Sequence, residues 1–246
     1  MSIQVSDSKP FNPISDLPWE FIPTAAWNTN TANGGTAALS AGNLYVLLTS
    51  TSLANSRASL FTGKSNALNT FIPQFNGNTS TAKARLNFSR KMGLMIALND
   101  GQNGIPANHN LYVVLGVDYT PAFVGTFTDK AIGFQIQTTA VDVARIRIIY
   151  HDGTVQKESA WVNLDKPAGW QMWTNFGFVL YADGTGKIEL HTFTGTSQGL
   201  AISVTDGPVG AQTATSLVNV YVTHLGSATA AQGNFCITQP RVVFGT

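Results

Sequence analysis

The side chains that best suggest chemistry are a group of aromatic rings and one amide in the second half of the chain. They are Trp161, Asn163, Trp170, Trp173 and Tyr181. Large aromatic rings with polar neighbours are a combination that holds sugar rings. On an extended chain, Trp170 and Trp173 face opposite ways, so one of them is expected to be exposed. The pattern favours packing in the core or between sheets for this group, and a carbohydrate-binding site is the alternative.

The carboxylates do not indicate an enzyme. Glycoside hydrolysis uses two carboxylates about 5–9.5 Å apart, whereas the three glutamates, Glu20, Glu158 and Glu189, are far apart in the sequence. Asp152 and Asp183 each precede a glycine, which is typical of a hairpin turn. We therefore expect no catalytic residue and no enzymatic activity.

The histidines and the single cysteine do not indicate a metal centre or a cofactor. His109, His151, His191 and His224 have none of the spacings of metal ligands. Cys236 is the only cysteine, so the chain has no internal disulfide framework. Its position within a strand pattern predicts a small buried apolar side chain. We expect no metal and no cofactor.

The composition excludes several classes of partner. The chain has 246 residues, of which 11% are charged, with a formal net charge of +1. A typical soluble domain has about 25% charged residues, and nucleic-acid binding needs a basic patch. We therefore expect no nucleic-acid partner. No apolar run is long enough to cross a membrane, and the start resembles no secretory signal. Synthesis in a cytoplasm is the corresponding expectation.

The elements that would position these side chains are strands. Apolar residues alternate with polar ones over 132–136, 144–150 and 176–180, which is the period of a half-buried strand. Turn pairs such as Asp152-Gly153 separate about twelve or thirteen such segments, a number typical of a sandwich. We predict an all-β fold, a two-sheet antiparallel β-sandwich in which residues 44–246 form a single domain.

Residues 1–43 have a different pattern and are predicted to form an extended N-terminal arm. Prolines interrupt every regular element there, because proline fixes φ and lacks a backbone donor. Three large aromatic residues could anchor the arm: Trp19, Phe21 and Trp27. The favoured interpretation is an arm lying on its own domain, and the alternative is an arm that contacts a neighbouring subunit.

Four segments carry a resemblance to a known family. They are Ala131–Ile136, Arg145–Thr154, Trp173–Leu190 and Cys236–Phe244. In their order and alternation they resemble the concanavalin A-like lectin/glucanase jelly roll, in the form found in phage and viral structural proteins. The glucanase run Glu-x-Asp-x-Glu and the galectin run His-x-Asn-x-Arg are absent. The resemblance therefore implies a jelly-roll fold and carries over no catalytic residue.

Together these observations favour a non-enzymatic structural component of a virus or phage particle, such as a capsid-surface decoration, tail or fibre protein. Such a protein would assemble as a homo-oligomer and with other particle proteins through its β-sandwich and arm. It would be located in the virion after synthesis in the host cytoplasm. A lectin-like module that binds a glycan receptor is the alternative, and a glycoside hydrolase is disfavoured by the missing paired carboxylates.

Overall fold

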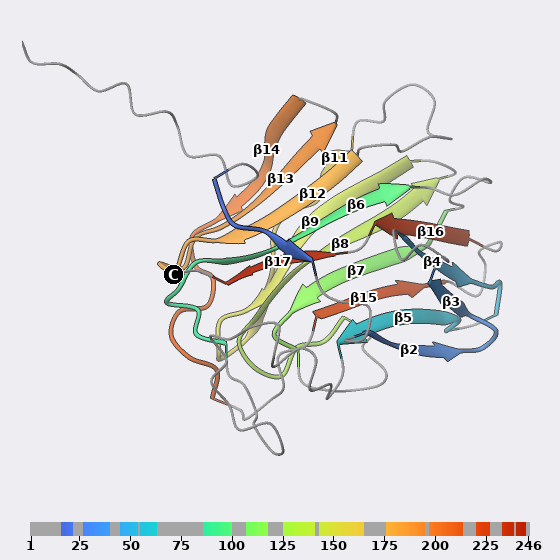
Figure 1. The fold of residues 1–246 in the computed structure, drawn as a ribbon, viewed down its shortest axis with the longest axis horizontal. Helices are drawn as coiled ribbons and strands as arrows, with labels where there is room; N and C mark the ends of the chain where they lie inside the picture. The colour runs from blue at the N-terminus through green and yellow to red at the C-terminus, as the bar shows by residue number, and fades with distance from the viewer. Residues whose placement is uncertain are drawn as a thin grey trace, which may run out of the picture.

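In the part of the chain that the computed structural model describes, every element of regular secondary structure is a β-strand (Figure 1). The described residues are 16–21, 27–39, 45–53, 55–62, 86–99, 107–117, 125–140, 143–164, 176–194, 197–213, 220–226, 233–238 and 240–244. Within these ranges no helix is long and apolar enough to cross a membrane.

Sheet A has nine strands, and its main path runs in the order β14-β13-β12-β6-β16-β4-β3. These strands are β14 (Ser197–Val204), β13 (Ile188–Thr194), β12 (Phe176–Ala182), β6 (Met92–Asn99), β16 (Gly233–Thr238), β4 (Tyr45–Ser50) and β3 (Thr36–Leu39). The remaining two, β17 (Arg241–Phe244) and β1 (Glu20–Phe21), extend from β6. Every pairing in sheet A is antiparallel.

Sheet B has eight strands, and its main path runs in the order β10-β9-β8-β7-β15-β5-β2. These strands are β10 (Gln156–Glu158), β9 (Val143–His151), β8 (Ala131–Ala140), β7 (Asn110–Leu115), β15 (Val220–Leu225), β5 (Arg57–Thr62) and β2 (Trp27–Ala32). A further strand, β11 (Val162–Leu164), pairs with β9, as β10 does, so β10 and β11 together form this edge of the sheet. Sheet B is also antiparallel throughout.

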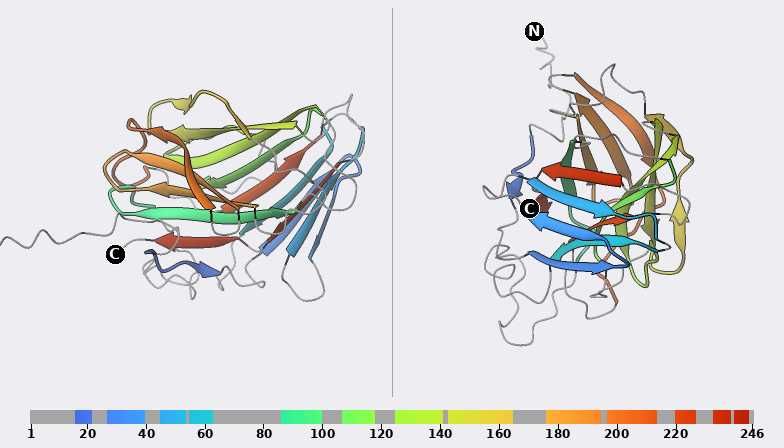
Figure 2. Two further views of the ribbon diagram at one scale, coloured as in Figure 1. Left: turned by 90° about the horizontal axis from the view of Figure 1, so that it is seen from above. Right: turned by 90° about the vertical axis from the view of Figure 1, so that its right-hand side faces the viewer.

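The core lies between the two sheets, which are stacked as layers (Figure 2). The alternation seen in the sequence determines which side chains enter it, because successive side chains of a strand point to opposite faces. Ile132, Phe134 and Ile136 of β8 are buried, and Phe134 contacts Phe178 of sheet A with ring centroids 5.5 Å apart. The prediction of an all-β, two-sheet antiparallel sandwich is confirmed.

The predicted turn between β9 and β10 is present at Asp152-Gly153. Gly153 has φ +106, a left-handed conformation that glycine adopts without a Cβ penalty. The Asp152 carboxylate accepts hydrogen bonds from the backbone N–H groups of Thr154 and Val155 at 2.7 and 2.9 Å. These bonds explain why an aspartate precedes the glycine in this hairpin.

A buried glutamine holds three loops together at one end of the sandwich. Gln212 is 2% exposed. Its Oε1 accepts a hydrogen bond from the backbone N–H of Leu86 at 3.1 Å, and its Nε2 donates to the carbonyl oxygens of Gly116 and Lys130, both at 2.7 Å. Because a buried backbone group without a partner is costly, this one side chain stabilises the fold by bonding to main-chain groups of three separate segments.

Strands within the first 43 residues are part of both sheets. β1 pairs with β17, β2 pairs with β5, and β3 pairs with β4. The described part of this segment therefore packs on the sandwich of the same chain. Strand β3 belongs to sheet A, although it precedes residue 44, where the sandwich domain was expected to begin.

Candidate functional site

The outer face of sheet B carries two rows of polar side chains that run across neighbouring strands. In the first row Asn110 of β7 is opposite Gln137 of β8, which is opposite Arg145 of β9, with Asn163 of β11 beyond it. Residues directly opposite on an antiparallel pair have their side chains on the same face. Sequence alternation places these residues outward, and the register aligns them.

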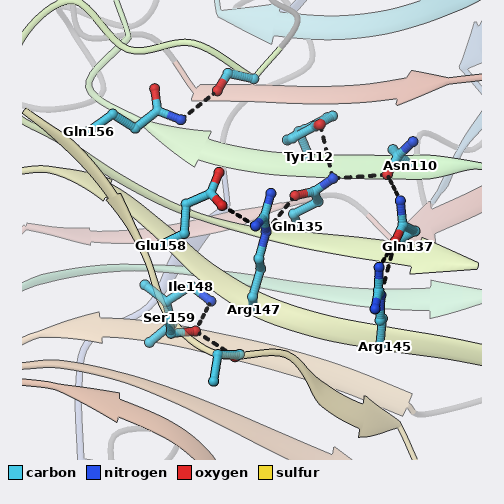
Figure 3. Close-up of polar contacts among 12 residues, drawn as sticks. Asn110, Tyr112, Gln135, Gln137, Arg145, Arg147, Ile148, Gln156, Glu158 and Ser159 are labelled. Carbon is cyan, nitrogen blue, oxygen red and sulfur yellow. Dashed lines mark hydrogen bonds and ion pairs between the residues drawn. The ribbon is translucent and has the colours of Figure 1, made fainter.

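The second row lies two residues further along each strand. Tyr112 of β7 is opposite Gln135 of β8, which is opposite Arg147 of β9. Trp161 immediately precedes β11 and continues this row at the edge of the sheet, because Val162 is opposite Ile146. The two rows together form what we call the polar face, shown in part in Figure 3.

Amide groups connect the two rows. Gln135 Nε2 donates hydrogen bonds to Asn110 Oδ1 and to the Tyr112 hydroxyl oxygen, both at 2.9 Å. Gln137 Nε2 donates to the same Asn110 oxygen at 3.2 Å. These bonds determine the orientation of both glutamine amides, so each Oε1 is directed toward β9 (Figure 3).

The two arginines of β9 bind these amide oxygens. Arg145 donates from Nε and Nη2 to Gln137 Oε1 at 2.9 and 2.5 Å. Arg147 donates from Nε to Gln135 Oε1 at 2.8 Å and forms an ion pair with Glu158 of β10 through Nη1. The arginines are thereby held in fixed rotamers, which reduces the entropy lost when a ligand binds.

Trp161 packs against both arginines. The guanidinium carbons of Arg145 and Arg147 lie 4.3 and 4.4 Å from the centroid of its ring, well within the range of a cation–π interaction. The tryptophan remains partly exposed. The polar face therefore presents an aromatic ring beside two cationic groups at the edge of sheet B.

The segment 125–130 covers the neighbouring part of the same face. Phe127 is buried there with Val114 and Ile149, which lie one step beyond the second row. Gln156 of β10 fastens the segment: its Oε1 accepts from the Phe127 N–H at 2.9 Å, and its Nε2 donates to the Gly125 carbonyl oxygen at 3.0 Å. The polar face is thus bounded on one side by an anchored loop.

The electrostatic environment keeps the tyrosine of the polar face protonated. Burial raises the pKa of Tyr112 above its ordinary value, the nearby Arg147 opposes this shift, and Glu158 adds to it. Glu158 is the only carboxylate with a described contact to the polar face, and Arg147 neutralises it.

The structure brings together only some of the aromatic and amide residues selected from the sequence. Trp161 and Asn163 are both on the edge of sheet B. Tyr181 is on β12 of sheet A, 4% exposed, in an apolar cluster with Met95 and Val179. Trp170 and Trp173 lie outside the described residues. Tyr181 and Trp161 are therefore on different sheets.

The structure also shows where the three aromatic residues proposed to anchor the arm lie relative to the chain's own sheets. The Trp19 side chain packs on the outer face of sheet A against the cluster that contains Tyr181. Phe21 is in β1 and Trp27 begins β2, so both are part of the sheets of their own chain. The side chains of these two residues lie outside the described part of the structure.

Six residues of the polar face were not selected from the sequence: Asn110, Tyr112, Gln135, Gln137, Arg145 and Arg147. The alternating pattern had already placed the glutamines and arginines on one side of their strands. The missing information was the register, because a shift by one residue would reverse the face of every side chain.

Histidines form a separate polar cluster between the sheets. His109, His224 and Ser50 are all fully buried. Ser50 Oγ lies 3.0 Å from His109 Nδ1 and 3.1 Å from His224 Nε2, and the two ring nitrogens are 2.9 Å apart. Among the residues that the structure describes, no group of three or more His, Cys, Asp or Glu side chains could hold a metal ion.

Comparison with known proteins identifies the fold. No protein-family model and no curated protein matches the sequence. Among solved structures, the chain is similar to a legume lectin-like domain from Entamoeba histolytica, with a TM-score of 0.53, 10% identity and 89% of both chains covered. It is also similar to the exoplasmic/lumenal domain of VIP36 in a form bound to Ca²⁺ and Man3GlcNAc, with a TM-score of 0.55, 10% identity, and 90% of this chain and 84% of that chain covered.

A third similar structure comes from a phage. The CBM2 module of the evolved Dit protein of Lactobacillus casei BL23 phage J-1 matches with a TM-score of 0.52 and 11% identity, over 91% of this chain and 92% of that chain. At these identities the likeness concerns the fold. The chain has the β-sandwich fold of concanavalin A-like and legume lectin-like carbohydrate recognition domains.

Proposed function

We propose that this protein is a non-enzymatic carbohydrate-binding domain and that its ligand binds at the polar face of sheet B. The observation that carries the proposal is the partly exposed Trp161 ring beside Arg145, Arg147 and the connected amides. An aromatic ring offers a flat apolar surface to a sugar ring, and the surrounding polar groups can select its substituents. The fold shared with carbohydrate recognition domains supports this proposal.

The rigidity of the polar face is a further argument for binding. Each glutamine is held at both ends of its amide, by Asn110 on one side and by an arginine on the other. A site whose groups are already oriented loses little entropy when its ligand is bound.

We further propose that the domain is a surface component of a virus or phage particle, assembled from several copies and located in the virion. The similarity to a phage Dit module supports this role. The low proportion of charged residues, 11%, is also consistent with a surface that contacts other copies, because charged residues are depleted at interface cores.

A glycan array with matched tryptophan variants tests the carbohydrate-binding proposal. Wild-type protein should be retained on a subset of glycans, and Trp161→Ala should lower that retention about tenfold or more, as expected when a stacking partner is lost. Trp19→Ala is the control, because Trp19 packs on the outer face of sheet A. The proposal fails if wild-type protein binds no glycan or if both variants behave alike.

Light scattering after size-exclusion chromatography tests the assembly proposal. A discrete mass of several chains at micromolar concentration is the expected result, since closed symmetric assemblies are typical of homo-oligomers. A single-chain mass across the whole concentration range would contradict assembly through the sandwich, while leaving carbohydrate binding as a separate proposal.

A further inference from the structure

The hydrogen-bonding capacity of the polar face is unequally distributed between donors and acceptors. The side-chain oxygens of Asn110, Gln135 and Gln137 all accept hydrogen bonds within the face. The Tyr112 oxygen also accepts one, and the Glu158 carboxylate is paired with Arg147. Apart from the amide of Asn163 at the edge of the sheet, the side-chain amide oxygens of the polar face are therefore engaged by the protein itself, and the charged groups that remain beside Trp161 are the arginine donors.

Arg145 supplies the strongest of these donors. Its two described hydrogen bonds both go to the neutral Gln137 amide oxygen, from Nε and Nη2. No carboxylate pairs with Arg145 among the described residues, whereas Arg147 has Glu158. Its side chain is partly exposed beside Trp161, and within the described part of the structure its Nη1 group donates no hydrogen bond to the protein.

The position against Trp161 strengthens the attraction of Arg145 for an anion. The guanidinium carbon is 4.3 Å from the centroid of the indole ring, so the ring displaces water near the group. A less hydrated guanidinium forms stronger hydrogen bonds to anionic oxygens, and its planar edge matches the two oxygens of a carboxylate or sulfate. The charges of Arg145, Arg147 and Glu158 together leave the polar face with a net charge of about +1 at neutral pH.

We propose that the ligand of the polar face is an acidic glycan, whose carboxylate or sulfate group binds the guanidinium of Arg145 while a sugar ring lies against Trp161. This inference rests on the proposed carbohydrate-binding function and specifies the chemical class of its ligand. Because the oxygens of Asn110, Gln135 and Gln137 already accept hydrogen bonds from neighbouring strands, we expect a neutral sugar to find few acceptors for its hydroxyl groups near Trp161.

Matched pairs of polysaccharides on a biosensor surface test the inference. One pair is polygalacturonate and its methyl ester, which have the same sugar and linkage and differ in the carboxylate. The other is dextran sulfate and dextran, which differ in the sulfate ester. At least one acidic polymer should bind about tenfold or more tightly than its neutral partner, and the pair that shows this difference identifies the anionic group.

Three variants separate the role of Arg145 from general charge attraction. Arg145→Gln should remove most of the preference for the acidic polymer, because the charge is lost while an amide remains beside Gln137. Glu158→Gln should increase acidic binding several-fold, because it frees Arg147. Arg90→Gln is the control, since Arg90 is an exposed cation outside the polar face and should have little effect.

The outcomes distinguish failure of the inference from failure of the proposed function. If neutral and acidic partners bind equally, or if Arg145→Gln and Arg90→Gln weaken binding equally, the acidic-ligand inference is wrong. If only neutral glycans of the array are retained, in a manner that depends on Trp161, the inference is wrong and the carbohydrate-binding function stands. If neither the array nor the polymers retain the protein, both are wrong.

Discussion

Because burial keeps His224 neutral in the folded protein, we expect the free energy of unfolding to fall steeply in mild acid. The Nδ1 atom of His224 lies 3.1 Å from the carbonyl oxygen of Leu48, which can only accept, so Nδ1 carries the proton of the neutral ring. Nε2 is left as the acceptor beside Ser50 and His109. Burial lowers the pKa of His224 to about 3, the neighbouring His109 contributes, and the bond to Leu48 opposes the shift.

The direction and magnitude of the change in stability with pH follow from the lowered pKa of His224. A histidine in the unfolded chain binds its proton near pH 6.5, whereas His224 in the folded protein stays neutral down to about pH 3. Between these values the unfolded state holds more protons, so stability falls as the pH falls. The slope approaches about 1.4 kcal/mol per pH unit, and the loss between pH 7.5 and pH 5 is about 2 kcal/mol.

Urea unfolding at several pH values between 7.5 and 5, followed by tryptophan fluorescence and far-UV circular dichroism, measures this slope. His224→Gln should make the free energy of unfolding less dependent on pH by about 2 kcal/mol over this range. His224→Phe provides a second non-titrating variant if the first does not fold.

Phe235→Leu is the matched control for this experiment. Phe235 contacts the His224 ring edge-on, with centroids 4.7 Å apart. Its replacement loosens the same part of the core without removing a titratable group, so it should lower stability similarly at every pH. Equal pH slopes for the wild type and both His224 variants would refute the reasoning.

Three further predictions concern a buried glutamine side chain, a closely packed glycine and the pKa of a tyrosine. Gln212→Leu should lower the free energy of unfolding in urea by about 2–4 kcal/mol, because it leaves three buried main-chain groups without their partner. Gly133→Ala should cost about 1–3 kcal/mol in the same assay, because the added Cβ would lie 2.8 Å from the Val113 carbonyl oxygen. Burial and, next, the hydrogen bond to Asp206 raise the pKa of Tyr150 to about 12. Asp206→Asn should therefore lower that pKa, as measured by ultraviolet titration of the phenol, and an unchanged value would contradict the assigned contact.

Much of the fold was predictable because it depends on local pattern. The alternation over 144–150 places Ile146 and Ile148 in the core and Arg145 and Arg147 on the outer face. Likewise, Asp152-Gly153 specifies its turn through one carboxylate and one residue with positive φ. Both features involve residues close in sequence, so strand periodicity and turn chemistry are sufficient to predict them.

The candidate site was predictable only in part. Trp161 and Asn163 were selected because of their residue types, but Tyr181 was grouped with them by proximity in sequence and lies in the other sheet. Asn110 and Gln137 are far apart along the chain and become neighbours only through the pairing of β7 with β8. Residue type therefore indicated a kind of chemistry without identifying which side chains share a surface.

Alternation along the chain was enough to predict an all-β sandwich and the core-facing side of several strands, because hydrophobic burial acts on a period of two residues. The folded chain was needed to see that Arg145 and Arg147 contact Trp161. It was also needed to see that His109, His224 and Ser50 lie together between the sheets. The physical reason is register: many alignments bury the same apolar side chains, but each alignment brings a different set of polar groups together.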